Sequence, residues 1–432
     1  MAISTGRSSA EEISGGGCVF KVDPTFSGLT TLHQFNGTDG NDPVAPPVEG
    51  SDGNYYGTTS GTFVNNGGTI YKITSSGTFT LLHTFGAFGT KGGFGLYGPL
   101  VQGVDGNFYG TTQAGSQNDG TVFRITRQGT VTILHSFTGL DGDSPTGQLV
   151  LASDGNFYGT TIGGGSSGGG AAFRISSQGS FTLLQSFNTN VGVGSPVSSL
   201  MQASDGNLYG TAQFGIYQST TSGVVTSVGV FDIANGQNPY VTPMQHTSGL
   251  IYGDTESGGE FENQGVIYTL NLSLPPFAAL VPRTSKTVNS IGILGQGFTG
   301  ATRVSFNGVA AKTFQVTSDT FMTATVPGAA TTGLVTVTIP SGKLVSNQSF
   351  LVIPTITSFT PPSGAVGTAV TIKGASLAQT SKVTFGGITA TFTVNSNSQV
   401  TATVPAGAVT GKIVVTTAGG VVTSSTAFTV TP

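Results

Sequence analysis

The sequence predicts an all-β protein, with an N-terminal β-propeller of five to six blades followed by two immunoglobulin-like β-sandwich domains. Two repeated patterns support this prediction. A seven-residue phrase begins at Asp52, Asp105, Asp154 and Asp205, at steps of 53, 49 and 51 residues, and a different pattern recurs once in the C-terminal part. A period near 50 residues is typical of stacked copies of one supersecondary unit.

The unit is clearest within residues 146–187. Asp154-Gly155 lies between two short apolar segments, which predicts a hairpin with a type I′ turn, because both central residues of that turn need positive φ. A second hairpin turns at Gln178-Gly179. The four expected strands are residues 148–152, 157–161, 171–176 and 180–187. Four antiparallel strands in about 45 residues have the size of a propeller blade.

The number of hairpins sets the number of units. The first hairpin is expected near residues 44–58, 97–112, 146–161, 197–212 and 240–254, and the second near 18–35, 69–85, 121–137 and 170–187, with a degenerate copy at 223–233. The N-terminal unit lacks its first strand, and residues 265–270 have no partner strand after them. Complementary fragments predict a ring closed by strand exchange, which removes exposed edges. A right-handed solenoid stack is the alternative.

The repeat resembles a known family. Phe-Tyr-Gly-Thr-Thr at 157–161, Gly-Thr-Val-Phe-Arg-Ile at 120–125, Leu-His-Ser-Phe at 134–137 and Asp-Gly-Asp-Ser-Pro at 141–145 are similar to the GloVer tandem repeat, from residue 15 to about 272. The resemblance implies a secreted bacterial protein, and it implies no particular activity. Members often end in a surface-sorting anchor; this chain ends at Pro432 without one, so covalent surface attachment is not expected.

After Pro275-Pro276 the period changes, which predicts domains at residues 1–274, 275–353 and 354–432. Short alternating strands separated by turns are typical of immunoglobulin-like sandwiches. Both C-terminal modules resemble IPT/TIG domains, the second more closely, through residues 354–359, Pro361, Gly364, Gly367 and Thr368. The first has Val288 where Gly367 falls, which predicts an altered entry turn. The resemblance implies spacer or interaction modules, and the sandwich fold does not determine function.

Composition excludes several classes of partner. Fifteen Lys and Arg against 19 Asp and Glu give a net charge of −4, so a nucleic-acid partner is not expected. No apolar run reaches the roughly 18 residues of a membrane helix. The single cysteine, Cys18, is expected to be a small strand residue. Low charge with abundant Thr, Ser, Gly and Asn indicates an extracellular or cell-surface protein. The N-terminus lacks a signal peptide, and the chain is expected to begin partway through a repeat.

The histidines and cations recur in register. His33, His83 and His135 share one strand position, where a half-buried structural role is expected rather than a metal site or triad, and His246 is isolated. The basic residues Lys21, Lys72, Arg124 and Arg174 also share a position. They would form a cationic ring if their strand lined a channel; a solvated strand face is the favoured interpretation. Residues 39–43 and 141–145 have calcium-like spacing but lack a bidentate Glu, so turns are favoured.

These observations predict no catalytic, cofactor-binding or metal residue, no cofactor, and no assignable ligand-binding residue. The favoured hypothesis is a non-enzymatic secreted or cell-surface scaffold that presents propeller loops to a protein or carbohydrate partner. The alternatives are an extracellular polysaccharide hydrolase or lyase with accessory modules, and a purely structural matrix component. Spacing says little about how far apart carboxylates lie across a ring, so the enzyme alternative stays open. Residues 86–95 and 216–228 depart most from the repeat and are the expected contact regions.

Overall fold

The computed structural model describes residues 2–6, 16–22, 28–61, 67–86, 95–114, 119–145, 147–188, 192–259 and 264–432. These residues form strands, turns and loops and contain no helix. The chain divides into two compact units, one of residues 1–246 with 250–272 and one of 247–249 with 273–432. The fold is therefore all-β, as the sequence predicts.

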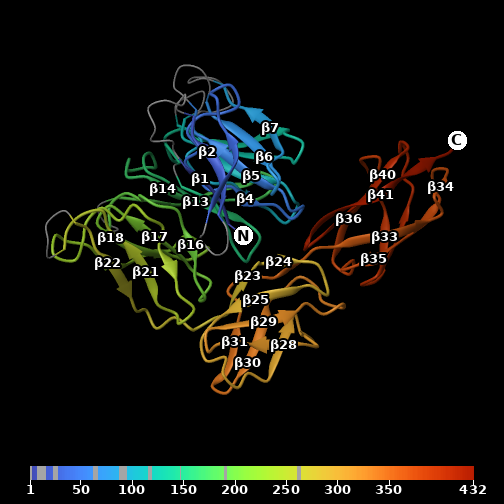
Figure 1. Ribbon diagram of the computed structural model, residues 1–432. Helices are drawn as coiled ribbons and strands as arrows, with labels where there is room; N and C mark the ends of the chain where they lie inside the picture. The colour runs from blue at the N-terminus through green and yellow to red at the C-terminus, as the bar shows by residue number, and fades with distance from the viewer. Residues whose placement is uncertain are drawn as a thin grey trace. The chain divides into compact units, whose positions relative to one another are not determined.

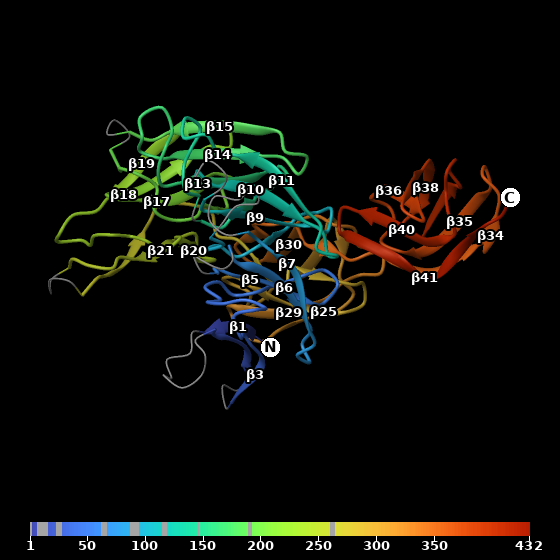
Figure 2. The ribbon, with the colours of Figure 1, turned by 90° about the horizontal axis from the view of Figure 1, so that it is seen from above.

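The described residues of the first unit form six small antiparallel sheets that follow one another in chain order (Figures 1 and 2). Sheets 1 and 2 are β1 (Ala2–Gly6), β2 (Cys18–Val22) and β3 (Leu29–Gln34), then β4 (Val48–Glu49), β5 (Tyr55–Thr59), β6 (Thr69–Ile73) and β7 (Phe79–Thr84). Sheets 3 and 4 are β8 (Val101–Gln102), β9 (Phe108–Thr112), β10 (Thr121–Ile125) and β11 (Val131–Ser136), then β12 (Val150–Leu151), β13 (Phe157–Thr161), β14 (Ala171–Ile175) and β15 (Phe181–Ser186). Sheets 5 and 6 are β16 (Met201–Gln202), β17 (Leu208–Ala212), β18 (Gly215–Ser219) and β19 (Val225–Val230), then β20 (Met244–Gln245), β21 (Ile251–Asp254) and β22 (Ile267–Leu270).

The predicted hairpins lie where the repeat places them, with one exception. The degenerate hairpin expected at 223–233 is wrong, because β18 and β19 form a complete hairpin over residues 215–230. It was displaced because only two residues, Gln213 and Phe214, separate β17 from β18, where the other repeats have a longer glycine-rich segment. The fifth sheet is consequently as regular as the sheets before it.

The predicted type I′ turn is also wrong. In the first copy, Gly53 N donates to Gly50 O at 2.9 Å and Gly50 N donates to Asn54 O at 2.8 Å, so Ser51 and Asp52 are the central residues. Gly53 has a φ of 78°, while Asp52 is not among the residues with positive φ. This is a type I turn followed by a left-handed glycine, the usual three-residue hairpin loop. The Asp-Gly pair fits both turns, and only the backbone distinguishes them.

Neighbouring sheets pack face to face through apolar side chains. Between sheets 2 and 3 the buried cluster joins Tyr56, Ile70 and Phe85 to Phe108 and Phe123, and equivalent clusters lie between sheets 1 and 2, 3 and 4, and 4 and 5. The Tyr56 and Phe108 rings stack at 4.0 Å between centroids. Because each sheet is too small to bury its faces alone, stability comes from these joints between neighbours.

The two end sheets lack strands in the predicted way, since β1–β3 lack a first strand and β20–β22 lack a fourth among the described residues. The closure predicted from these fragments is not formed: β1–β3 and β20–β22 remain separate sheets. Ile267 of the sixth sheet is 83% exposed and Leu29 of the first is 70% exposed. The strands that the first and sixth sheets lack are different ones, yet the two sheets do not combine, and Leu29 and Ile267 at the two ends of the series stay exposed.

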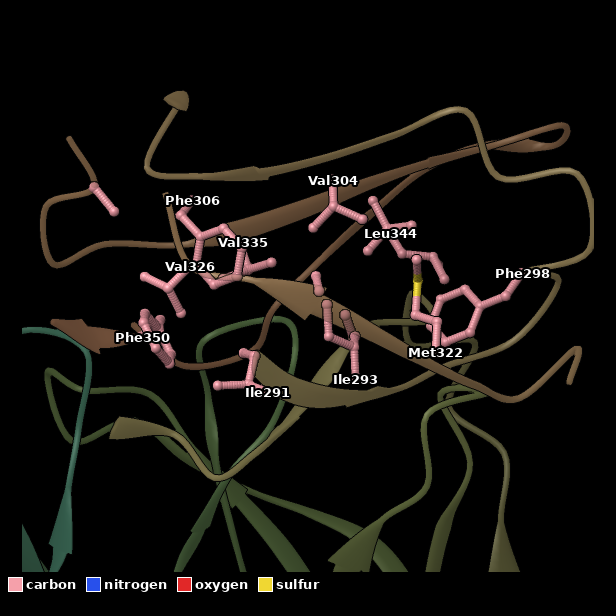
Figure 3. Packing of buried hydrophobic residues seen from close by; sticks show 14 of the residues in the cluster. Ile291, Ile293, Phe298, Val304, Phe306, Met322, Val326, Val335, Leu344 and Phe350 are labelled. Carbon is pink, nitrogen blue, oxygen red and sulfur yellow. The ribbon is translucent and has the colours of Figure 1, made fainter. Parts of the chain in front are cut away.

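The second unit contains two sandwiches with separate cores. The first has β23 (Ala279–Val281), β25 (Ser290–Leu294), β29 (Phe321–Thr325) and β28 (Phe314–Val316) in one sheet, β27 (Val309–Ala310), β26 (Arg303–Phe306), β30 (Val335–Ile339) and β31 (Gly342–Val345) in another, and the parallel pair β24 (Thr284–Ser285) and β32 (Leu351–Val352). The second has β33 (Thr355–Thr360), β35 (Ala369–Ala375), β39 (Gln399–Thr403) and β38 (Phe392–Ser396), facing β34 (Ser363–Gly364), β41 (Gly420–Val430), β40 (Gly411–Thr417), β36 (Thr380–Phe385) and β37 (Ile388–Ala390). Figure 3 shows Ile291, Phe306, Val335 and their neighbours filling the first core.

The altered entry turn expected at Val288 is wrong. Val288 N donates to Val326 O at 2.8 Å, as Gly367 N donates to Val404 O at 2.9 Å in the second sandwich. Both residues are left-handed, with φ of 65° and 90°. The first sandwich therefore keeps the turn. It places a β-branched residue in the left-handed conformation, in which the Cβ comes too close to the following carbonyl oxygen.

We expect Val288→Gly to raise the free energy of unfolding by about 1 kcal/mol, because the left-handed conformation costs valine more than the extra flexibility of glycine costs. The reciprocal change Gly367→Val is expected to lower it by about 2 kcal/mol. A Cβ on Gly367 would meet no atom within 4 Å, so this loss measures backbone strain alone. Calorimetry of the full chain checks both values; effects of the same sign would contradict the explanation.

Candidate functional site

The two ends of the repeat sheets differ in kind. At one end, here called the turn end, short turns join the first strand to the second and the third to the fourth, as between β4 and β5 or β6 and β7. At the opposite end, the loop end, segments join the second strand to the third and one sheet to the next. These segments are long except between β17 and β18, where only two residues intervene. Because the strands are antiparallel, all loops of one kind lie at the same end of their sheets. Uniform turns and varied loops give the two ends different capacities for recognition.

A polar network recurs at the turn end. In the fourth sheet, Asp154 Oδ2 accepts hydrogen bonds from Tyr158 Oη at 2.7 Å and Asn156 Nδ2 at 3.0 Å, while Asp154 Oδ1 accepts from Asn156 N at 3.0 Å. The same bonds form at Asp52, Asp105 and Asp205. The seven-residue phrase therefore encodes a self-contained turn. Its carboxylate is committed to holding that turn.

Electrostatics agree with this structural role. Burial, the hydrogen bond to Asp154 and the charge of Asp154 together raise the pKa of Tyr158 to about 12. Burial also raises the pKa of Asp154, but the hydrogen bonds from Asn156 and Tyr158 outweigh burial and hold that pKa below its usual value. The tyrosine thus stays a donor and the carboxylate an acceptor at neutral pH, which is the arrangement the turn needs.

The recurring cations lie beside these tyrosines. Lys72, Arg124 and Arg174 are half-buried on the third strands, opposite Tyr56, Tyr109 and Tyr158, respectively. Arg124 Nη1 donates to the Ser177 carbonyl of the next sheet at 3.4 Å, and Arg174 Nη2 lies 3.4 Å from Thr182 Oγ1. Arg124 and Arg174 therefore have partners on or next to their own sheets, as expected of a strand face. The cationic ring stays a prediction.

The recurring histidines His33, His83 and His135 lie on fourth strands, and two of them pair with the Asp of the following loop. His33 Nε2 lies 2.9 Å from Asp39 Oδ2, and His135 Nε2 lies 2.9 Å from Asp141 Oδ2. The rings stack on Phe79 and Phe181 of the next sheet, with centroids 3.7 Å apart in both cases. Burial lowers the pKa of His135, and Asp141 offsets this only in part.

The loops that the sequence offered as calcium sites use their carboxylates internally. Asp39 Oδ1 accepts from Asn36 N at 3.0 Å, and Asp141 Oδ1 accepts from Thr138 N at 2.9 Å. The residues before the prolines, Asp42 and Ser144, have left-handed φ of 59° and 57°. These are turns, as favoured from the sequence. Within the described ranges, no group of three His, Cys, Asp or Glu side chains could hold a metal ion.

The loop end carries exposed aromatic side chains that sequence reasoning missed. Tyr97, Phe214 and Tyr240 are 37%, 52% and 56% exposed, whereas the largest aromatic side chains of the sheets are fully buried. Phe214 N donates to Val193 O at 2.8 Å and Phe214 O accepts from Phe231 N at 2.8 Å, so the backbone beneath the ring is fixed. The signal for Phe214 was available, since it stands where the glycine-rich segment of the repeat is missing.

Three carboxylates gather at the loop end of the third sheet. Ser144 N donates to Asp119 O at 3.1 Å, so Asp119 lies beside the loop that carries Asp141 and Asp143. Burial and then the charges of Asp143 and Asp141 raise the pKa of Asp119 above its usual value. Asp143 Oδ1 also accepts a hydrogen bond from Ser144 Oγ at 2.8 Å. Carboxylates can accept hydrogen bonds from hydroxyl-rich ligands.

The two contact regions expected from the sequence have different outcomes. Residues 216–228 form parts of β18 and β19 and the turn between them, so this region is largely regular sheet. Residues 87–94 of the other region lie outside the described residues. The exposed ring of Phe214 lies two residues before region 216–228, and that of Tyr240 lies in the connection that follows β19; both are on loops rather than strands.

Small sheets packed in series, followed by two β-sandwiches, define a class of multidomain β-repeat proteins. The Gloeobacter/Verrucomicrobia repeat matches residues 5–153 and 146–300, and the IPT/TIG domain matches residues 354–430. The chain belongs to the Gloeobacter/Verrucomicrobia repeat family. The resemblance seen in the sequence is thereby confirmed for the repeats and for the last module, while an IPT/TIG identity for residues 275–353 stays a prediction.

Several solved structures are similar to parts of the chain. PorZ, a surface component of the type IX secretion system of Porphyromonas gingivalis, is 14% identical with a TM-score of 0.40, over 100% of this chain and 58% of that chain. TolB from Acinetobacter baumannii is 13% identical with a TM-score of 0.38, over 80% and 65%. SGBP-B from a xyloglucan utilization locus of Bacteroides uniformis is 20% identical with a TM-score of 0.19, over 35% and 48%. The chain thus spans about half the length of SGBP-B.

Similarities at this level concern the fold alone and carry no functional information. No curated protein matches the chain in sequence. In the part of the chain that the structure describes, no helix is long and apolar enough to cross a membrane.

Proposed function

We propose that the protein is a non-enzymatic extracellular scaffold whose loop end binds a neutral carbohydrate, with the repeat sheets packed in series and the sandwiches as spacers. The observation that carries this proposal is the set of exposed rings Tyr97, Phe214 and Tyr240 at one end of sheets that otherwise bury their large aromatic side chains. An exposed, fixed aromatic ring offers a flat apolar face, which suits the apolar face of a sugar ring.

The carboxylates at the loop end indicate which polysaccharides the protein would bind. Asp119, Asp141 and Asp143 lie at the same end as the aromatic rings, and the chain carries a net charge of −4. Carboxylates accept hydrogen bonds from sugar hydroxyls but repel uronic acids and sulfated sugars. The loop end therefore suits neutral polysaccharides better than acidic ones.

The enzyme alternative has one observation in its favour, the same three carboxylates. A glycosidase needs a pair of carboxyl groups on either side of a bound glycosidic bond, one of them with a raised pKa. Asp119 has a raised pKa, but the acids that raise it, Asp143 and Asp141, belong to a turn that uses Asp141 internally. Binding without cleavage is the function that these contacts support better.

We expect the full chain to be retarded in native gels containing at least one of a panel of neutral polysaccharides, and not in gels containing alginate or polygalacturonate. Phe214→Ala and Tyr240→Ala are each expected to weaken that binding about tenfold, since loss of a stacked ring costs about 1.4 kcal/mol. Titration calorimetry with the retarding polysaccharide measures the change in Kd.

The matched control is Ile388→Ala, which truncates a side chain that is 41% exposed on the second sandwich. It should leave Kd unchanged. Binding that survives both aromatic substitutions would overturn the assignment of the loop end. Release of reducing ends from the bound polysaccharide, abolished by Asp119→Asn, would show the enzyme instead.

A further inference from the structure

The sixth sheet ends the series with an apolar face that every earlier sheet buries. One position on the third strand defines this face, and its residues in sheets 1 to 5 are Val19, Ile70, Val122, Ala172 and Ile216, all 0–2% exposed. Ile267 holds this position in the sixth sheet, opposite Asp254, and is 83% exposed. Met244 on the first strand of the same sheet is 63% exposed. This face, called here the forward face, is a joint surface without its partner.

The first sheet has the opposite face uncovered. In sheets 2 to 5 the aromatic residue of the third strand packs against the preceding sheet and is fully buried, as Tyr71, Phe123, Phe173 and Tyr217. Phe20 holds this position in the first sheet and is only half-buried. Leu29, at the start of β3, is 70% exposed, whereas the equivalent Phe79 stacks on His33 of the sheet before it. We call this the backward face.

These two faces are complementary, because each of the four joints between sheets 1 and 5 packs a forward face against a backward face. Both are exposed in the same chain, so its own first sheet does not cover its sixth. We propose that the forward face of β20–β22 binds the backward face of β1–β3 of a second copy of this chain, head to tail. The interface continues the packing of the internal joints.

The sixth sheet departs from the internal joints at one position. At each internal joint a threonine at the end of the second strand donates to a carbonyl just before the first strand of the next sheet, as Thr160 Oγ1 does to Ser198 O at 2.9 Å. The other donors are Thr5, Thr58, Thr111 and Thr211. The sixth sheet has Asp254 at this position, so a joint with a second copy would form without the threonine bond.

The geometry sets the kind of assembly. Different surfaces on the two copies make a heterologous contact, which closes into a ring if the rotation permits and otherwise extends into a filament. Only the second and third strands of both sheets can overlap fully, since one sheet lacks its fourth strand and the other its first. The contact is therefore smaller than an internal joint, and association should depend on concentration.

Sedimentation velocity of the full chain between about 1 and 100 μM tests the proposal. We expect the mean mass to rise with concentration, and both Ile267→Asp and Leu29→Asp to remain monomeric. Because each variant keeps one intact face, an equimolar mixture should form a heterodimer and nothing larger. Val409→Asp, at a side chain 59% exposed on the second sandwich, should associate like the unaltered chain.

Each outcome decides the proposal. Monomers of the unaltered chain at every concentration would overturn it. So would unchanged association of Ile267→Asp, or a mixture of the two variants that stays monomeric, since a two-fold interface gives that result. Circular dichroism of each variant verifies that the aspartates, at positions already exposed, leave the fold intact.

Discussion

Phe173→Ala is expected to lower the free energy of unfolding of the repeat unit by about 4 kcal/mol. Phe173 is fully buried, with its ring centroid 5.2 Å from Phe137 of the preceding sheet and 5.6 Å from Phe181 of its own. Truncation removes a ring from the joint between sheets 3 and 4 and leaves a cavity that two flanking sheets cannot collapse to fill. Urea denaturation followed by far-UV circular dichroism measures the loss.

The same ring explains the glycine of the repeated phrase, and a second variant tests this. A Cβ on Gly159 would lie 2.5 Å from Phe173 Cζ, so Gly159→Ala alone is expected to cost about 2 kcal/mol. In the double variant the new methyl group occupies space that the ring has left. The double variant should therefore be at least about 1 kcal/mol more stable than the sum of the single effects predicts. Additive losses would mean that the ring does not select the glycine.

The glycine is an instance of what the sequence could and could not predict. The repeat period, the strands and most hairpins follow from apolar patterning and turn residues, and they were predicted. The reason for Gly-Thr-Thr did not follow, because it lies on the adjacent strand: each second-strand glycine faces an aromatic ring. The pairs are Gly57 with Tyr71, Gly110 with Phe123, Gly159 with Phe173, Gly210 with Tyr217 and Gly253 with Tyr268. Periodicity identifies a conserved spacing within the chain but not its steric cause.

A second feature was present in the sequence but invisible within any one repeat. Ser153 N donates to Gln202 Oε1 of the next sheet at 2.9 Å, and the same bond joins Ser51 to Gln102 and Ser204 to Gln245. In the remaining joint of this series the two positions hold Val104 and Leu151, and the leucine side chain has no oxygen to accept this bond. Because the two bonded residues belong to successive repeats, the pairing becomes visible only when each repeat is compared with the next one along the chain.

The candidate site was harder to predict for a physical reason. Exposure, not residue type, distinguishes Tyr97, Phe214 and Tyr240 from the aromatic residues of the sheets. Exposure depends on where the loops lie after the sheets have packed. The Val288 turn was mispredicted in the same way, because hydrogen bonds from Val288 and to its neighbours hold a backbone conformation that the residue itself disfavours. Tertiary context overrode local preference at both places.

Gly170→Ala is expected to lower the free energy of unfolding by about 3 kcal/mol. Gly170 immediately precedes β14 with a φ of 89°, and a Cβ there would lie 2.3 Å from Thr161 O, a backbone atom. The change combines left-handed strain with a clash that no side-chain rotation can relieve. Gly68, Gly120 and Gly265 hold the same place in their sheets and would meet the backbone oxygen of Thr59, Thr112 and Thr255 in the same way.

Gly155→Ala is the matched control, because Gly155 has a similar φ of 82° but a Cβ there would meet no atom within 4 Å. It should cost only the left-handed strain, about 1 kcal/mol. The difference between the two variants, measured in the same urea denaturation, isolates the steric cost of closing the loop against the second strand. Equal losses would mean that the loop moves away from the sheet easily, and the start of the third strand would then not be fixed by this close approach.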